Sequence, residues 1–245
     1  MHLSPLPSRP TAVDVCTSRL RAAILAGSLA PGDRLPAERD LAQQLDVNRV
    51  TVRGALGRLT AAGLLRVRQG SGYTVREYQT SGGSDLLAPL ADIAQSAGRL
   101  PEVASELLRV RRHLAMALLE RLAEVQPDAE GVAAAVDQFE TVVLASAPFA
   151  DIVAADLAVL AALIAAADSP ALSLCLNPIT SVLAHLPALS RAMYRDPAEN
   201  LRGWRLFVAW LRSPALTDSA VLAQVLAARD AATLAALTTP RLVQP

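Results

Sequence analysis

The sequence predicts a mainly α-helical protein, with an N-terminal winged helix-turn-helix followed by an all-α antiparallel bundle of about seven helices. Residues 36–63 show two amphipathic helical patterns joined by a short turn, and residues 64–75 form two short strand-like runs around a glycine-rich tip. From residue 85 onward, apolar helical patterns are broken by Pro and Gly, without a convincing strand. Together these patterns indicate a small DNA-binding type of fold joined to a helical bundle.

The first helix is expected over residues 11–26. Its apolar residues recur at three- and four-residue steps, which gives the helix one face for the core. These residues are Val13, Cys16, Leu20 and Ile24. Gly27 stands where a helix C-terminal cap belongs.

The second and third helices form the predicted helix-turn-helix. Pro36 suits the first position of the second helix, and Asn48 is a suitable N-cap for the third. The third helix turns its apolar side chains toward the core and leaves Arg49 and Arg53 on other faces. The predicted buried positions are Val52, Ala55, Leu56 and Leu59.

The domain boundary is expected at residues 79–84, a Gly- and Ser-rich stretch typical of a flexible linker. Residues 1–78 would then form the winged helix-turn-helix, and residues 85–245 an all-helical effector-binding and dimerisation domain. The predicted helices of this second domain cover residues 85–97, 101–125, 128–146, 149–167, 170–194, 198–212 and 217–237.

Charge is divided unevenly between the two predicted domains. Residues 1–78 hold 11 Arg and 6 acidic residues, a net +5, whereas residues 79–245 hold 12 Arg and 17 acidic residues, a net −5. Only the first domain is therefore expected to meet a polyanion such as DNA. All 23 basic residues are Arg, which excludes a pyridoxal Schiff base and a P-loop, since both need Lys.

Polar residues at the start of the third helix are candidates for DNA contacts. Arg49 and Arg53 lie one turn apart, and each guanidinium fork can bond both acceptors of a guanine edge. Asn48 and Thr51 can bond phosphate or a base edge, and Arg39 on the second helix can do the same. The full predicted set is Arg39, Asn48, Arg49, Thr51, Arg53, Gln69, Gly70 and Ser71.

Several motifs resemble the GntR family of bacterial transcription regulators. The matching runs, which cover nearly all of residues 11–76, are Leu20–Gly27, Pro31–Arg39, Asn48–Arg53 and Arg68–Gly72. The resemblance implies a homodimer on an inverted-repeat operator, with repression as the common outcome. It also matches Arg39, Arg49, Thr51, Arg53, Gln69 and Gly70 to the family's DNA-contacting positions. Gly54 departs from the family pattern, which usually has Glu there.

The second domain resembles the effector domain of the FadR branch, at Thr80–Gly82, Leu107–Arg111 and Ala167–Pro170. Many members bind a metal through one Asp and three His. Asp156 matches the Asp, but Leu160 and Trp204 stand at two of the His positions, and the last helix has no His. The resemblance therefore implies neither metal nor cofactor, as in the fatty-acid-responsive regulators.

The apolar residues at the metal-ligand positions favour an apolar effector, such as a fatty acyl-CoA or another apolar carboxylate. Leu160, Trp204 and Phe207 would line the cavity, while Arg111 or Arg112 meets the anionic head; Asp156 is either part of this site or a capped or solvated acid. One alternative is a metal-dependent sensor of a small hydroxy or dicarboxylic acid. Two others are an enzyme that uses the bundle pocket and a purely architectural DNA-binding protein.

Composition argues against several other classes. The three His residues are scattered and no nucleophile–base pair stands out, so we expect no catalytic residues. The two cysteines, Cys16 and Cys175, lie in apolar runs and are expected to be buried thiols. The N-terminus lacks a signal-peptide core, and the longest charge-free apolar run, residues 157–167, is too short for a bilayer. We therefore expect a cytoplasmic protein with no membrane partner.

Overall fold

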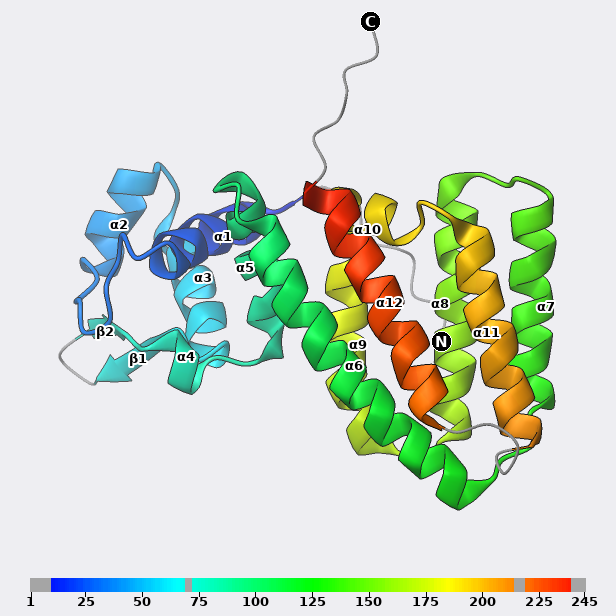
Figure 1. Cartoon of the computed structure of the whole chain (residues 1–245). Helices are drawn as coiled ribbons and strands as arrows, with labels where there is room; N and C mark the ends of the chain where they lie inside the picture. The colour runs from blue at the N-terminus through cyan, green and yellow to red at the C-terminus, as the bar shows by residue number, and fades with distance from the viewer. Residues whose placement is uncertain (1–9, 69–71, 214–218, 239–245) are drawn as a thin grey trace, which may run out of the picture. The chain divides into compact units, whose positions relative to one another are not determined.

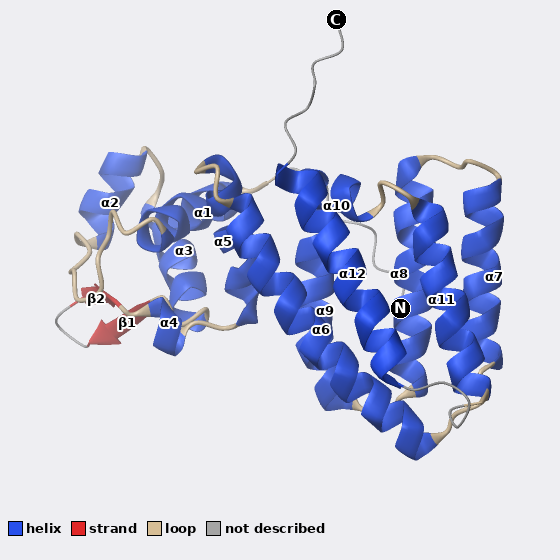
Figure 2. Ribbon diagram, in the orientation of Figure 1, coloured by secondary structure: helices blue, strands red, loops and turns tan. Residues whose placement is uncertain are grey.

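The structure, a computed structural model, describes residues 10–68, 72–213 and 219–238. The chain divides into two compact units, Met1–Ser96 and Ala97–Pro245. Within the described residues, the only sheet is one two-stranded ribbon in the first unit, and helices form nearly everything else (Figure 2). The predicted fold class, a winged helix-turn-helix followed by a helical domain, is confirmed.

The first unit begins with three helices and a hairpin. Its elements are α1 (Ala12–Leu25), α2 (Glu38–Leu45), α3 (Arg49–Ala61), β1 (Leu65–Arg68) and β2 (Gly72–Val75). α3 packs against α1, α2 and β1, and β1 pairs antiparallel with β2 (Figure 1). α2 begins at Glu38, beyond Pro36, so Pro36 precedes the helix instead of occupying its first position.

Local capping sets the ends of α1 and α3. Thr11 accepts a hydrogen bond from the backbone N–H of Asp14, whose carboxylate in turn accepts from the backbone N–H of Thr11, forming a capping box. Gly27 follows α1 at φ +79°, a left-handed conformation that suits glycine. The four predicted core positions of α3 are all 0% exposed, as the helical spacing indicated.

Residues 78–96 belong with the first unit. Here α4 (Tyr78–Ser81), a 3₁₀ turn at Ser84–Leu86 and α5 (Leu87–Ser96) follow β2. The Ser81 hydroxyl donates to the Gly63 carbonyl at 2.8 Å, and a Cβ at Gly63 would lie 1.9 Å from the Ser81 carbonyl oxygen. Glycine at residue 63 thus permits a close backbone approach. The division between units falls after Ser96, beyond the linker expected at residues 79–84.

The second unit contains seven helices in the part of the chain described. They are α6 (Leu100–Val125), α7 (Glu130–Leu144), α8 (Phe149–Ala166), α9 (Pro170–His185), α10 (Pro187–Met193), α11 (Pro197–Arg212) and α12 (Ser219–Thr238). The helix predicted over 85–97 lies in the first unit instead, and the one predicted over 170–194 is two helices. Pro187 starts α10, which turns 98° from α9, because proline cannot continue the preceding hydrogen-bond ladder.

The core of the second unit is built mainly from Leu, Val and aromatic side chains of α6, α7, α8 and α11. Phe139 is fully buried, and α7 packs along α8 and α11 (Figure 1). Cys175 on α9 is exposed, so the prediction that both thiols are buried is right only for Cys16.

Two helices, Phe149–Ala166 and Ala220–Thr238, are long and apolar enough to cross a membrane by length and composition alone. Each carries a buried aspartate, Asp156 and Asp230 respectively, whose carboxylate is hydrogen-bonded to other helices of the bundle. The packing thus uses both as bundle helices. The charge-free apolar run of residues 157–167 is shorter than these helices, because a charged residue ends it on either side.

Candidate nucleic-acid interface and effector cavity

The N-terminal turn of α3 presents two side chains to solvent. Asn48 caps the helix, because its Oδ1 accepts the backbone N–H of Thr51 at 2.8 Å. Arg49 is exposed directly after this cap, and the side chain of Val50 beside it is 78% exposed. Val50 was not among the predicted contacts, although its position between Arg49 and Thr51 lies off the core periodicity of the helix.

Arg53 forms a forked ion pair with Glu38 of α2. Its Nη2 lies 2.8 Å from Glu38 Oε2, and its Nε lies 3.2 Å from the same oxygen. This hydrogen bond lowers the pKa of Glu38. The Arg53 side chain remains 71% exposed, so Glu38 orients it without covering it. Glu38 is a positioning residue that the sequence analysis did not identify.

The other predicted DNA contacts differ in accessibility. Arg39 is exposed on α2, whereas Thr51 is only 6% exposed, which leaves its side chain little surface for phosphate or a base edge. Gln69, Gly70 and Ser71 lie outside the described residues. The strand before them carries two exposed basic side chains, Arg66 and Arg68.

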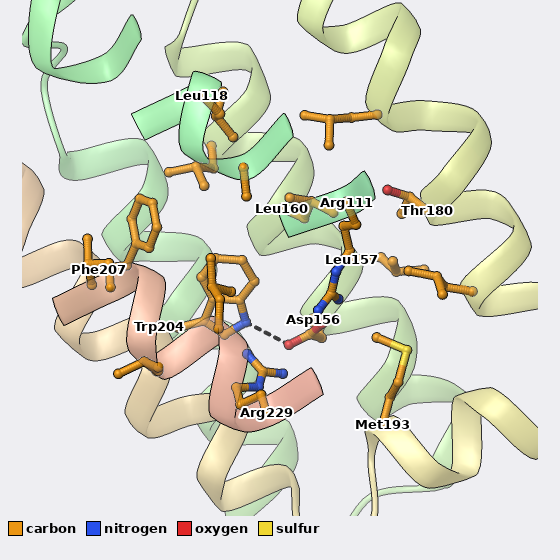
Figure 3. A pocket seen from close by; sticks show the side chains of 18 of the residues that line it. Arg111, Leu118, Asp156, Leu157, Leu160, Thr180, Met193, Trp204, Phe207 and Arg229 are labelled. Carbon is orange, nitrogen blue, oxygen red and sulfur yellow. Dashed lines mark hydrogen bonds between the residues drawn. The ribbon is translucent and has the colours of Figure 1, made fainter. Parts of the chain in front are cut away.

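The second unit encloses a cavity of about 90 Å³ between α6, α8, α9, α11 and α12 (Figure 3). Five of the six residues predicted for an effector site line it: Arg111, Asp156, Leu160, Trp204 and Phe207. Arg112 is not part of the lining. Aliphatic and aromatic side chains make up most of the wall, as in typical small-molecule sites.

Asp156 is buried at the polar end of this cavity and accepts two hydrogen bonds. Its Oδ1 accepts from Trp204 Nε1 at 2.6 Å (Figure 3), and its Oδ2 accepts from the Tyr194 hydroxyl at 2.7 Å. Burial, and then the adjacent Asp156 charge, raise the pKa of Tyr194, so this phenol stays a donor. Asp156 is therefore neither a solvated acid nor a helix cap.

These residues do not fit a metal ion. Leu160 and Trp204 offer no metal-ligating lone pair, and both oxygens of Asp156 already accept from neutral donors. Across the described ranges, no group of three or more His, Cys, Asp or Glu side chains is placed to hold a metal. A zinc or nickel site needs several such donors converging.

Arg111 and Arg112 share a single carboxylate. Arg111 Nη2 lies 2.6 Å from Asp230 Oδ1, and Arg112 Nη1 lies 2.9 Å from Asp230 Oδ2. Burial raises the pKa of Asp230, and the two guanidinium groups oppose this rise. Both arginines that the sequence suggested for an anionic head are thus already paired within the protein.

Arg229 is the cationic residue of the cavity that the sequence analysis missed. It lines the cavity from α12, and burial lowers its pKa, with the Asp156 charge opposing that effect. The Arg229 side chain is half-buried, and the charge that acts on it most strongly is that of Asp156. One signal was present in the sequence: Arg229 and Asp230 are the only charged residues of Ser219–Thr238.

The first unit matches a known family of proteins. Residues 15–75 match the family described as bacterial regulatory proteins, gntR family. The transcriptional regulator Mce2R of Mycobacterium tuberculosis is 44% identical over 90 residues, 37% of either chain. The fatty acid metabolism regulator protein of Edwardsiella ictaluri is 32% identical over 147 residues, 60% of this chain and 59% of that protein.

The matched stretches span less than two thirds of these relatives. A solved structure of Lar, which controls expression of the Listeria monocytogenes agr system, superimposes with a TM-score of 0.58 at 17% identity. The match covers 94% of this chain and 98% of Lar. At this identity the likeness concerns the fold alone.

Proposed function

We propose that this chain, whose residues 15–75 match the gntR family of bacterial regulatory proteins, is a cytoplasmic, DNA-binding transcription regulator. It binds an inverted-repeat operator as a homodimer, represses transcription and responds to a small effector held in the second unit. Regulators of this family bind DNA and are not enzymes.

The observation that supports DNA binding most directly is the exposed N-terminal turn of α3. In a helix-turn-helix, this end of the second helix enters the major groove. Arg49 supplies a fork for a guanine edge, and Val50 supplies an apolar surface for a thymine methyl group. Glu38 orients the Arg53 side chain, and on DNA binding Arg53 replaces part of this ion pair with contacts to DNA. The exposed Arg39 contacts the phosphate backbone.

The effector regulates the protein because effector binding and DNA binding are thermodynamically linked. A ligand that binds one arrangement of the protein more tightly than another weakens operator binding by the difference in its binding free energy. A coupling of about 1–3 kcal/mol changes operator affinity roughly 5- to 150-fold. The largely apolar cavity with arginine at one end favours an apolar carboxylate as effector, the broader of the two classes suggested by the sequence.

The test is selection of bound fragments from a genomic DNA library by the full-length protein. We expect one enriched inverted repeat whose half-sites are separated by about one helical turn, 10–10.5 base pairs centre to centre. Binding should weaken steeply with salt, because released counterions contribute to affinity. Enrichment of no common sequence, with and without added carboxylates, would contradict the proposed function.

A further inference from the structure

We propose that Glu38 determines the DNA specificity of the protein: it directs Arg53 to a guanine edge and prevents Arg53 from binding phosphate regardless of sequence. This inference deepens the proposed function and rests on it, since it names what one residue contributes to the choice of operator. Glu38 acts through Arg53 and is therefore a positioning residue of the interface.

The ion pair between Glu38 and Arg53 uses only one edge of the guanidinium group. Arg53 Nε lies 3.3 Å from Oε1 and 3.2 Å from Oε2 of Glu38, and Arg53 Nη2 lies 2.8 Å from Oε2. Among the described residues, no hydrogen bond involves Arg53 Nη1. A guanidinium group has five N–H donors, so its two Nη groups can meet the N7 and O6 acceptors of guanine. The bonds from Nε to Glu38 stay intact, and at most the Nη2 bond is exchanged.

Stability of the fold does not account for an acidic residue at this position. The Arg53 side chain is 71% exposed, and exposed ion pairs contribute little to folding. A negative charge at the start of α2 interacts favourably with the helix dipole, but Asp40 in the same turn provides that interaction as well. A carboxylate beside a surface that binds a polyanion also opposes binding. Selectivity explains its presence better than stability does.

Phosphate and guanine differ in how they meet this ion pair. A phosphate group that binds Arg53 brings a negative charge next to the Glu38 carboxylate, and like charges at close range repel each other. A guanine edge is neutral and presents two acceptors, so it binds without this repulsion. Because Glu38 neutralises Arg53, this arginine adds little to the counterion release that drives sequence-independent binding. The ion pair thus lowers non-specific affinity more than operator affinity.

The neighbouring arginines lack such a partner. Arg39 and Arg49 are exposed, and within the described ranges neither forms an ion pair with an acidic residue. The hydrogen bond from Arg53 lowers the pKa of Glu38 most, and the charge of Arg49 adds to this effect, so Glu38 lies within electrostatic reach of both. Arg39 and Arg49 can thus bind either phosphate or a base, whereas Arg53 is held in one orientation.

Fluorescence anisotropy of the full chain, with the selected operator and with a scrambled duplex of equal length, tests this inference. Glu38→Gln keeps the shape of the side chain but removes its charge. We expect its affinity for the scrambled duplex to rise about fivefold, with about one more counterion released for each subunit, because Arg53 now binds phosphate. Operator affinity should stay the same or fall, so the ratio of the two affinities should drop about fivefold or more.

Asp40→Asn is the matched control, because it removes the same charge from the same turn of α2. It should change the affinities for both duplexes alike and leave their ratio unchanged. When Arg53→Gln is already present, Glu38→Gln should no longer change the ratio. Equal effects of Glu38→Gln and Asp40→Asn on the ratio, or an effect of Glu38→Gln that persists without Arg53, would overturn the proposal.

Thermal unfolding shows whether each variant folds. If Glu38→Gln does not, Arg53→Lys supplies a second test, because lysine pairs with Glu38 as a point charge but has no planar edge for guanine. This variant should bind the scrambled duplex as the wild type does and lose much of its preference for the operator. An unchanged preference in Arg53→Lys would equally contradict the proposal.

The two duplexes separate failure of this inference from failure of the proposed function. A selected operator whose preference over the scrambled duplex is unaffected by Glu38→Gln would remove the role of Glu38 and leave the regulator standing. Selection of no operator would remove the proposed function. The scrambled duplex would then still decide whether Glu38 limits phosphate binding by Arg53.

Discussion

The two units of this chain use arginine in opposite ways. In the first unit, Arg39, Arg49 and Arg53 are exposed around the start of α3, and only Arg53 is held by an acidic neighbour. In the second unit, Arg111 and Arg112 turn inward to one buried carboxylate, and Arg229 lines a cavity. The same guanidinium group thus faces solvent in one unit and balances internal charge in the other. Burial, more than residue type, separates the two roles.

The largest effect that tests this comparison is expected from Asp230→Ala. The substitution leaves Arg111 and Arg112 half-buried without a counter-charge, and breaking such a buried pair costs about 3–5 kcal/mol of unfolding free energy. Urea unfolding followed by circular dichroism measures the loss.

The matched control is Glu199→Ala, which removes the partner of Arg202 in an exposed pair of α11. Exposed pairs contribute about 0–1 kcal/mol, so stability should change little. Equal losses for the two variants would show that Asp230 does not stabilise the bundle through its buried pairing.

A smaller effect, confined to DNA binding, is expected from Arg49→Ala. Loss of one bidentate guanine contact costs about 1–3 kcal/mol of binding free energy for each half-site, and sequence-specific binding should disappear at physiological salt. Fluorescence anisotropy with the selected operator and with a scrambled duplex measures both affinity and specificity.

Arg19→Ala is the control for this prediction, because Arg19 is an exposed arginine of α1 in the same unit. Its loss removes the same charge and should weaken binding to both duplexes alike. An unchanged operator affinity in Arg49→Ala would show that α3 does not read the operator through this residue.

A stabilising effect of about 0.5–1 kcal/mol is expected from Gly57→Ala in α3. No heavy atom lies within 4 Å of the Cβ that would be added at Gly57, so the gain in helix propensity is not offset by a clash. Gly54→Ala should gain less, since its Cβ would lie 3.3 Å from a methyl carbon of Val13 on α1. Thermal unfolding of both variants measures the difference, and a larger gain for Gly54→Ala would contradict the packing of α1 against α3.

No effect is expected when the protein is treated with EDTA. The donors around Asp156 are neutral side chains that do not suit a metal, unlike the Asp and His set implied by the family resemblance. Melting temperature and operator affinity should both remain unchanged. A clear fall in either would reveal a metal site and revive the alternative of a metal-dependent acid sensor.

The sequence by itself determined the features that depend on neighbouring residues. Asn48 was identified as a cap because a side-chain oxygen can reach a backbone N–H three residues later. The buried face of α3 followed from helical spacing. The family resemblance predicted Asp156, Leu160 and Trp204 as effector-site residues, and all three line one cavity.

Only the tertiary structure decided which charges pair and which segments pack together. Asp230 meets Arg111 from 119 residues away, a pairing that no local pattern specifies. Residues 78–96 pack on the first unit because Gly63 permits a close backbone approach and Leu86 joins the apolar core, although residues 79–84 have the composition of a linker. Arg229 emerges as the cation facing the cavity only once its neighbours are known. Burial and charge balance are properties of the assembled core, whereas caps and periodicity are properties of the chain.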